Sequence, residues 1–428
     1  MKKQVLLLFA LFLFSVETKA QVDSLKINLD FRTRAELDNG YKTLIPAKQK
    51  PETNVFSRAR LGVDYYWQNL ELFMSLQDAR IWGEVSSINQ RSGSLNVNEA
   101  WAKYHFNNKI GIKVGRQILS YDDERLLGAL DWQMQGRSFD GAKGIFRFSP
   151  QSKLETVVTY NNDDNDANDL ADREFYNILD AGERTKSMQI VHYQYLSPKA
   201  SLSLIGLNNV VQNLNGSHYD MLTVGINAKK YNENLGFFGS AYWQTGKNTL
   251  AQSKNAYQFS ANIDFILNQN INFILGTEWL SGTNYNAEVS INNSFSPLYG
   301  TNHKFNGFMD YFFVGNHFNS VGLKDFYLKS NFKLSPKAAL AFSLHGFASN
   351  AKLGFDLTEN KEYPQYLGTE GDVVFTYKVA NVFSMQFGHS QMFATDGMKF
   401  LKKVQEPASM QSWTWLGLDF GSRFKVKK

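Results

Sequence analysis

The sequence predicts an all-β fold, namely a transmembrane antiparallel β-barrel of about 18 strands with long extracellular loops and short periplasmic turns. Three observations support this fold class: an export signal at the N-terminus, apolar and polar residues that alternate in many short segments, and connections that are short and long in turn. The 428 residues are 43% hydrophobic and 14% aromatic, which excludes an intrinsically disordered chain.

Residues 1–20 have the features of a secretory signal peptide. Lys2 and Lys3 are followed by an apolar run over residues 5–16, and a small-x-small cleavage site ends at Ala20. The run is too short to remain as a membrane anchor. A buried N-terminal helix is the alternative. We therefore expect an exported protein whose mature chain starts directly after the signal.

Apolar and polar residues alternate along the mature chain. In residues 25–38, apolar side chains such as Leu29 and Phe31 alternate with polar or charged ones, and residues 256–265 and 370–378 repeat the pattern. A period of two predicts β-strands with one apolar and one polar face. Strands of about ten residues with two such faces fit a tilted crossing of an outer membrane. A soluble β-sandwich also alternates, so this pattern alone does not decide between the two folds.

The connections between these segments favour the barrel over the sandwich. Short turns such as residues 68–69 and 107–108 alternate with long loops such as 161–186 and 281–322. Tight turns at one rim and long loops at the other are the layout of a transmembrane barrel, whose closure leaves no unpaired edge. An even strand number places both termini of the mature chain, residues 21–428, in the periplasm. The expected strands are residues 25–38, 54–67, 70–82, 95–106, 109–117, 141–149, 153–160, 187–196, 200–212, 220–231, 235–245, 256–267, 271–280, 323–334, 338–348, 366–379, 382–392 and 411–424.

A barrel of this size has a lumen that its own side chains cannot fill. We predict that the loop near residues 118–140 folds inward, because it combines many charges with bulky apolar residues. Arg125 and Arg137 are then expected to line the narrowest part of the pore, where charges are least screened. Wall charges such as Arg32 are expected to matter less, because salt screens them across a wide lumen. The expected supports of this constriction loop are Asp131, Trp132, Phe139 and Asp140.

The polar faces of the strands carry basic residues that the alternation directs into the lumen. Rings of arginine and lysine favour anions, and a guanidinium matches a carboxylate with two hydrogen bonds. The alternative is that acids such as Asp30, Glu36 and Glu71 pair with these charges, which then only solvate the wall. Arg116 is directed toward lipid by the alternation unless a bulge at Gly115 turns it inward. The predicted pore-lining, anion-binding residues are Arg32, Arg34, Arg58, Arg60, Lys103, Lys113, Arg125 and Arg137.

The charge balance agrees with a path for anions. The net charge of +5 falls to +3 when the three lysines and one glutamate of the signal are removed. Residues 161–186 carry eight acids and three basic groups, so the rest of the mature chain is near +8. The acidic run 161–172 has residues that can bind calcium loosely, but a solvated loop facing lipopolysaccharide is the simpler interpretation. No metal or other cofactor is therefore expected.

Motifs for catalysis are weak. Asp122, Asp123 and Glu124 are adjacent acids in a loop, whereas glycoside cleavage needs two separated carboxyl groups. The seven histidines lack metal-ligand spacing. No phosphate-binding glycine loop is present, and a pI of 8.9 alone does not indicate nucleic acid. We expect neither enzyme activity nor a nucleic-acid partner.

Several separated motifs resemble the alginate export porins. These are "GRQILSYDDERLLGALDWQMQGRSFDGAK" (115–143), "QDARIWGE" (77–84) and "NEAWAKYHF" (98–106). "SPLYGTNHKFNGFMDYF" (296–312) is similar to the loop motif of that family around His303 and Asp310. The resemblance runs from about residue 25 to the end of the chain. It implies an 18-stranded outer-membrane barrel, and it implies passage of an anionic uronic-acid polymer through an arginine-rich pore.

The leading hypothesis is an outer-membrane channel for anionic solutes, of the uronic-acid polysaccharide or oligosaccharide type. A general diffusion porin for small carboxylates or sugars is the alternative, and a barrel enzyme or a plugged structural or adhesion barrel stays open. We expect a monomer in contact with outer-membrane lipid and lipopolysaccharide. A periplasmic scaffold protein is a further candidate partner.

Overall fold

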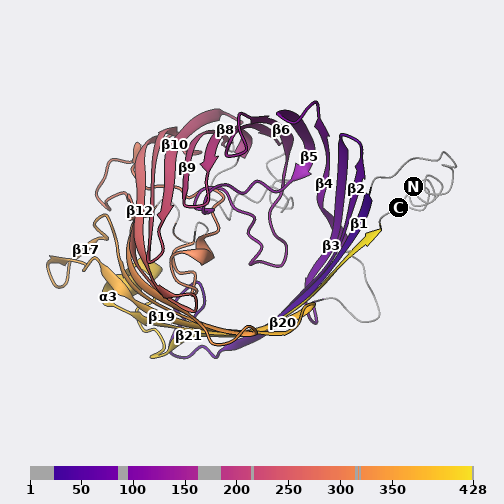
Figure 1. The fold of residues 1–428 in the computed structure, drawn as a ribbon. Coiled ribbons are helices and arrows are strands. Elements are labelled where there is room, and N and C mark those ends of the chain that lie inside the picture. The colour runs from indigo at the N-terminus through magenta and orange to yellow at the C-terminus, as the bar shows by residue number, and fades with distance from the viewer. Residues whose placement is uncertain are drawn as a thin grey trace.

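The computed structural model describes residues 24–84, 95–161, 185–213, 216–313, 317 and 320–426. The proposed signal peptide and most of loop 161–186 lie outside these residues. The described chain forms a closed antiparallel barrel of 18 long strands, in which β1 pairs with both β2 and β21 (Figure 1). The predicted fold class is therefore confirmed, and each predicted strand agrees with the structure to within three residues at both ends.

The barrel strands have these bounds: β1 (Ser24–Asn39), β2 (Glu52–Trp67), β3 (Leu70–Ile81), β4 (Leu95–His105), β5 (Ile110–Gln117), β6 (Phe139–Arg147), β7 (Ser152–Tyr160), β8 (Thr185–Leu196), β9 (Ala200–Gln212), β10 (His218–Tyr231), β11 (Leu235–Lys247), β12 (Ser253–Asn268), β13 (Ile271–Leu280), β15 (Leu323–Lys333), β16 (Ala338–Ala348), β19 (Tyr366–Ala380), β20 (Phe383–Ala394) and β21 (Gln411–Val426). Shorter elements lie in the loops: β14 (Ile291–Asn292), η2 (Asn302–Lys304), β17 (Phe355–Asp356), β18 (Lys361–Glu362) and α3 (Asp396–Lys402).

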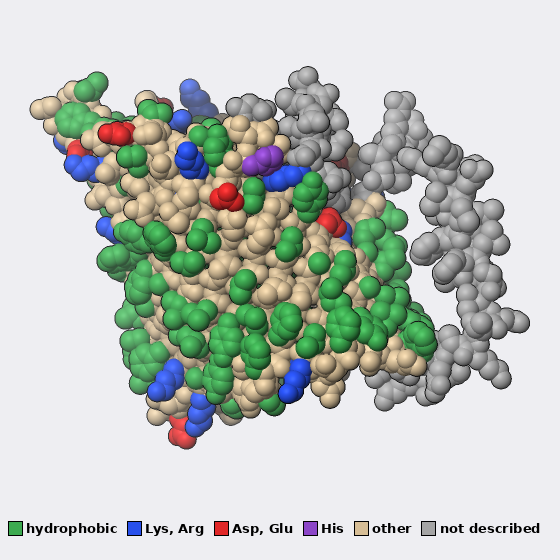
Figure 2. Space-filling view, turned by 90° about the horizontal axis from the view of Figure 1, so that it is seen from above, with side chains coloured by type: hydrophobic (Ala, Val, Ile, Leu, Met, Phe, Trp, Pro, Cys, Tyr) green, Lys and Arg blue, Asp and Glu red, His purple; other side chains and the backbone are tan. Residues whose placement is uncertain are grey.

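The outward face of the wall is apolar. Side chains such as Phe31, Ile112, Phe259, Leu275 and Phe375 are between 37% and 56% exposed there. Hydrophobic side chains cover the middle of the visible face, and most charged groups gather toward its two ends (Figure 2). This pattern matches a belt in contact with lipid. Among the described residues, no helix is long and apolar enough to cross a membrane.

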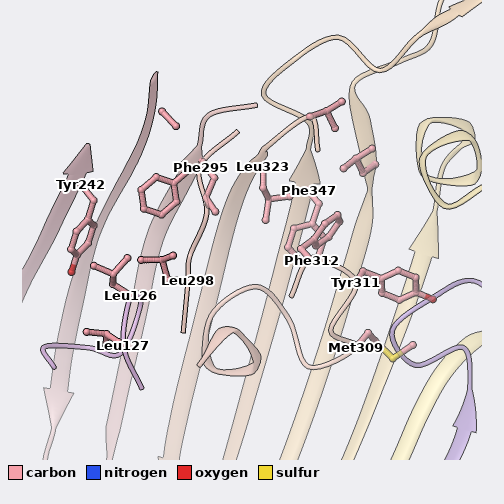
Figure 3. Packing of buried hydrophobic residues seen from close by; sticks show 14 of the residues in the cluster. Leu126, Leu127, Tyr242, Phe295, Leu298, Met309, Tyr311, Phe312, Leu323 and Phe347 are labelled. Atoms are coloured by element: carbon pink, nitrogen blue, oxygen red, sulfur yellow. The ribbon is translucent and has the colours of Figure 1, made fainter. Parts of the chain in front are cut away.

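The core of the molecule lies inside the barrel, where two loops meet. Loop 118–138 and the part of loop 281–322 around η2 both lie within the ring of strands (Figure 1). They form an isolated parallel bridge between Leu127 and Tyr299, and the Tyr299 amide donates to the Leu126 carbonyl at 3.0 Å. Leu127 and Leu298 are fully buried in the resulting cluster (Figure 3).

Glycines allow the two loops to approach this closely. A Cβ at Gly300 would lie 2.3 Å from the Arg125 carbonyl oxygen, and one at Gly128 would lie 2.2 Å from the Thr301 hydroxyl. Such distances are impossible for a real side chain, so both positions require glycine. The contact between the loops is therefore specified by backbone fit as well as by apolar burial.

We predict that Phe375→Arg impairs the barrel, whereas Thr376→Arg is mild. Phe375 is 37% exposed on the apolar outer face, and its neighbour Thr376 points into the lumen. An arginine on the lipid face costs roughly 2–4 kcal/mol near the bilayer midplane. The measurement is the free energy of unfolding of each variant in lipid vesicles, by denaturant titration. Equal losses for the two variants would show that the outer face does not contact lipid there.

Candidate functional site

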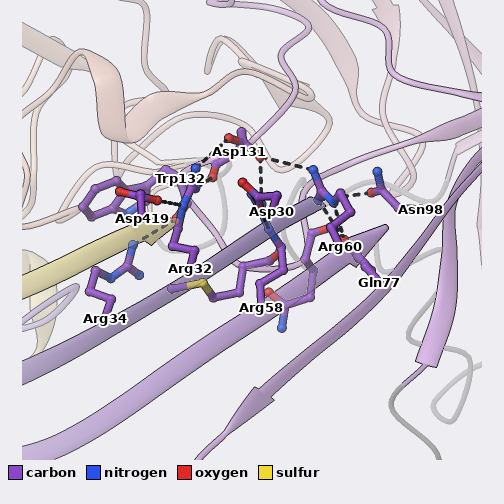
Figure 4. Close-up of polar contacts among 12 residues, drawn as sticks. Asp30, Arg32, Arg34, Arg58, Arg60, Gln77, Asn98, Asp131, Trp132 and Asp419 are labelled. Atoms are coloured by element: carbon purple, nitrogen blue, oxygen red, sulfur yellow. Dashed lines mark hydrogen bonds and ion pairs between the residues drawn. The ribbon is translucent and has the colours of Figure 1, made fainter. Parts of the chain in front are cut away.

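Three arginines of the first two strands form a cluster on the inner wall at mid-height. Arg32 is the ninth of the 16 residues of β1 and stands directly opposite Arg58 of β2, while Arg60 is the ninth of the 16 residues of β2. Like charges opposite each other destabilise a sheet, so acids must lie nearby. Arg58 pairs with Asp30 at 2.8 Å, and Arg32 pairs with Asp419 of β21 (Figure 4).

The tip of loop 118–138 places one carboxylate among these arginines. An Asp131 Oδ1 atom lies 2.8 Å from Arg58 Nη1 and 3.5 Å from Arg60 Nη1, and Oδ2 lies 3.3 Å from Arg32 Nη2. Burial raises the pKa of Asp131, but the positive charges of Arg58 and Arg32 outweigh it, so this pKa falls below its ordinary value. The carboxylate is ionised at neutral pH and joins the loop to the wall.

The next residue, Trp132, anchors the same tip by its ring. The Arg34 guanidinium lies 4.2 Å from the centre of the Trp132 ring, and the opposing His303 ring is stacked at 4.0 Å. Trp413 and Trp415 contact Trp132 with their rings nearly perpendicular, with centroids 5.7 and 5.1 Å away. The indole is therefore held between a wall cation, the second loop and β21. Asp131 and Trp132 both support the loop.

His303 and Asp310, the two residues of the second loop motif, brace loop 281–322. His303 Nδ1 lies 2.9 Å from Asp310 Oδ1, and the Tyr41 hydroxyl donates to the other Asp310 oxygen at 2.6 Å. Burial and the neighbouring carboxylate of Asp310 raise the pKa of Tyr41. Both carboxylate oxygens of Asp310 therefore have a partner, one in His303 and one in Tyr41. His303 and Asp310 act as structural supports in this arrangement.

Arg125 does not line the lumen, so that prediction is wrong. Its side chain is only 6% exposed, it pairs with Asp123 at 2.8 Å and with Glu278 of β13, and it lies over the Phe305 ring at 4.1 Å. Burial lowers the pKa of Arg125, but the carboxylates of Glu278 and Asp123 outweigh it and raise the pKa overall. A loop packed against the wall satisfies its charge with a wall acid, so this guanidinium is unavailable to a solute.

Other predicted loop residues have partners that alternation did not indicate. Arg137 is half-buried, and its guanidinium donates to the Tyr299 carbonyl. Phe139 and Asp140 belong to β6 rather than to the loop, which corrects their predicted place. The Phe139 ring contacts Tyr299 at 5.0 Å, whereas Asp140 pairs with Arg116 at 2.8 Å.

The Arg116–Asp140 pair lies on the outer face of the wall. Arg116 continues the alternation of Ile112 and Val114, and the pairing of β5 with its neighbours has no register shift at Gly115. The bulge that would turn Arg116 inward is therefore absent from these described strands. Asp140, its partner on the neighbouring strand, instead neutralises Arg116 at the end of the barrel that carries the long loops (the loop rim).

Three lysines form a second basic row, closer to the end of the barrel that carries the short turns (the turn rim). Lys103, Lys113 and Lys143 stand opposite one another across β4, β5 and β6. Lys103 pairs with Glu71 at 3.1 Å, and the Lys113 ammonium lies 3.7 Å from the centre of the Trp101 ring. Lys143, which pairs with Glu155 at 3.4 Å, was missed from the sequence, as was Asp419. Their positions beside other charged residues become evident from the pairing of neighbouring strands. The sequence of one strand does not reveal them.

The acids considered as neutralising partners do pair with several wall charges. Asp30 pairs with Arg58, Glu36 with Arg34 at 2.6 Å, and Glu71 with Lys103. Several wall charges thus have an ionic partner. Arg32 was expected to face a wide lumen, but it contacts the loop tip at Asp131. In the described part of the chain no three His, Cys, Asp or Glu side chains are placed to hold a metal ion. Residues 162–172, considered for calcium, lie outside that part.

A closed barrel that is apolar outside and polar inside is the fold of outer-membrane channel proteins. The family described as "Alginate export" matches residues 23–410, so the chain belongs to the alginate export family, as its motifs predicted. No curated protein matches the chain in sequence.

Solved outer-membrane proteins share the fold at low sequence identity. The structure of OccAB1 from Acinetobacter baumannii has a TM-score of 0.62 and 12% identity, and the match covers 95% of this chain and 99% of that one. OpdK from Pseudomonas aeruginosa has a TM-score of 0.61 and 10% identity, and the match covers 94% of this chain and 100% of that one. At such identities the likeness concerns the fold.

We predict that Arg125→Met destabilises the loop packing without changing ion selectivity. Removing the guanidinium leaves Asp123 and Glu278 buried and uncompensated, which costs about 3–5 kcal/mol. Denaturant titration gives the free energy of unfolding, and planar bilayers give the selectivity. The control is Lys304→Met, which removes a nearby but 53% exposed charge and should cost less than about 1 kcal/mol. A change in ion selectivity with an unaltered free energy of unfolding would show that Arg125 lines the lumen after all.

The docking of Asp131 should depend on pH only in acid. Because its pKa lies below the ordinary 3.8, its contribution to stability is complete above that value and is lost as the pH falls through the lowered pKa. The difference in unfolding free energy between the wild type and Asp131→Asn should stay constant between about pH 5 and pH 8. It should disappear in stronger acid. A difference that already changes in the neutral range would contradict the ion pairing.

Proposed function

We propose that this outer-membrane protein is a channel for anionic solutes that carry carboxylates, of the uronic-acid type, and that it has no catalytic role. One observation carries the proposal: three guanidiniums converge on a single carboxylate position at mid-height in the lumen. Guanidinium groups present paired donors that match carboxylate oxygens. A solute carboxylate is the chemical group that such an arrangement recognises.

The arginines are held in fixed orientations by the wall. The Arg58 Nε and Nη2 atoms donate to Asp30 at 3.1 and 2.8 Å. The same two atoms of Arg60 donate to Gln77 at 3.1 and 2.7 Å. The wall contacts leave Nη1 of Arg58 and Nη1 of Arg60 for the Asp131 carboxylate, so both guanidiniums are oriented without a further loss of side-chain freedom. This preorganisation favours recognition of an anion over simple solvation of the wall.

The lumen position of the cluster also favours selectivity. Arg32 and Arg60 are partly exposed, at 22% and 17%, whereas Arg58 is only 2% exposed behind its contacts with Asp131 and the Met134 carbonyl. A charge next to a packed loop is less screened than one across open solution. The lysine row offers further positive groups closer to the turn rim, so an anion would meet basic side chains at two levels.

Small carboxylates remain the second candidate, because the cluster is matched to one carboxylate at a time. Among structures with this fold is OpdK from Pseudomonas aeruginosa with vanillate, at 12% identity and a TM-score of 0.58. Vanillate is a small aromatic carboxylate. Block of ion current by galacturonate oligomers of increasing length separates the two candidates. Block that strengthens with length favours a polymer, and block that is strongest for the monomer favours small solutes.

The test of anion passage is the reversal potential in planar bilayers under a potassium chloride gradient. The wild type should prefer chloride. The double change Arg32→Gln and Arg60→Gln should move the reversal potential toward the cation side, because two lumen guanidiniums are lost. The control is Lys352→Gln, which removes a charge from an exposed loop and should leave the potential unchanged. A wild type without conductance, or one that prefers potassium, would overturn the proposal.

A further inference from the structure

We propose that Asp131 is an internal ligand, whose carboxylate occupies the binding site that a solute carboxylate takes during passage. The inference rests on the proposed function and deepens it, because it defines the site as Arg32, Arg58 and Arg60 and the recognised group as one carboxylate. Asp131 then competes with the solute. Its role is to tune affinity, and not merely to fasten the loop.

The hydrogen bonds of the three arginines are divided between wall and loop. Toward the wall, Arg32 uses Nε on Asp419, Arg58 uses Nε and Nη2 on Asp30, and Arg60 uses Nε and Nη2 on Gln77. Toward the Asp131 carboxylate, the contacts come from Nη2 of Arg32 and Nη1 of the other two. Arg32 Nη1 also donates to the Asp131 carbonyl at 2.7 Å, and Arg58 Nη1 donates to the Met134 carbonyl at 3.4 Å. Removal of the Asp131 carboxylate would therefore leave the wall contacts and the two contacts with loop carbonyls in place. Only the positions that the carboxylate oxygens occupy would become vacant.

The charges of the cluster balance only when Asp131 is counted. Its six ionised groups are Arg32, Arg58 and Arg60 against Asp30, Asp419 and Asp131. Without the loop carboxylate the cluster has one positive charge more than its wall acids neutralise. A single solute carboxylate restores the balance, so the exchange of Asp131 for that solute preserves both charge and hydrogen bonds.

Exposure makes the exchange feasible. The Asp131 side chain is 53% exposed, whereas Asp30 and Asp419 are 38% and 31% exposed. The loop carboxylate is thus the most accessible acid of the three. The tip itself stays anchored by Trp132, packed against Arg34 and His303, and by the Gln135 carbonyl, which accepts from Gln77 at 2.7 Å. Rotation of one short side chain frees the site, and the loop remains folded.

The experiment measures half-blocking concentrations of D-glucuronate on ion current through reconstituted channels, with neutral D-glucose as the solute control. Asp131→Asn should bind glucuronate at least about tenfold more tightly, because an internal competitor that fills the site most of the time lowers the apparent affinity in proportion. Asp131→Glu, which keeps the carboxylate, should resemble the wild type. Asp419→Asn removes the same charge from the wall side and should not tighten binding, because Asp131 stays docked.

A second variant tests competition after folding. The chain contains no cysteine, so Asp131→Cys supplies a unique thiol. Channels of this variant should show the tighter block by glucuronate once inserted. Modification with an anionic sulfonatoethyl methanethiosulfonate should restore the weaker block, and the neutral methyl reagent should not. This step keeps the test valid if Asp131→Asn assembles poorly.

The outcomes separate three ideas. One outcome is that glucuronate block is unchanged or weaker in Asp131→Asn and Asp131→Cys, in channels that remain anion-selective. It would show that Asp131 only fastens the loop to the wall. Equal tightening by Asp131→Asn and Asp419→Asn would show that net charge alone matters, and would also overturn the inference. Absence of anion preference in the wild type, read from the reversal potential and not from block, would overturn the proposed function itself.

Discussion

A closed sheet of 18 strands satisfies its backbone hydrogen bonds but encloses a space wider than its own side chains can fill. The consequences of this constraint run through the whole structure. Loop 118–138 and the part of loop 281–322 around η2 enter this space and pack against each other, and apolar residues such as Leu127 and Leu298 become the core. The usual arrangement of a soluble domain is thereby inverted, with apolar belts both outside the wall and between the inner loops.

Filling the lumen with charged loops creates a second requirement, which is that each buried charge finds a partner. Arg125 meets this requirement with Asp123 and Glu278, and its charge contributes to cohesion. Charged groups near the loop tip are different, because the Asp131 side chain is half exposed. At the boundary between the packed loops and the more open part of the lumen, charged groups remain accessible but are poorly screened.

The comparison with solved barrels concerns the fold of the wall. OccAB1 and OpdK share the fold at 12% and 10% identity. Such divergence is expected because a barrel wall requires a period-two pattern and closure, which many sequences satisfy. The arrangement of Arg32, Arg58 and Arg60 around Asp131 depends instead on particular residues of this chain.

Alternation and turn positions were enough to determine the wall of this protein from its sequence. Strands such as Ala200–Gln212 and Ile271–Leu280 begin and end where expected, and the inward direction of Arg32 and Arg60 follows from a period of two. These are local properties, set by neighbouring residues in one strand. The entry of loop 118–138 into the lumen was also inferred, because the loop combines many charges with bulky apolar residues that can dock against the wall.

Only the tertiary structure decided which loop charges are buried and which reach the arginines of the wall. Arg125 was expected in the pore and is buried, whereas Asp131 was expected as a support and stands among the arginines. A loop has no period, so its side-chain directions depend on partners distant in sequence, such as Glu278 for Arg125 and Arg58 for Asp131. The row of Lys103, Lys113 and Lys143 likewise depends on register across three strands, which pairing energies over the whole sheet determine.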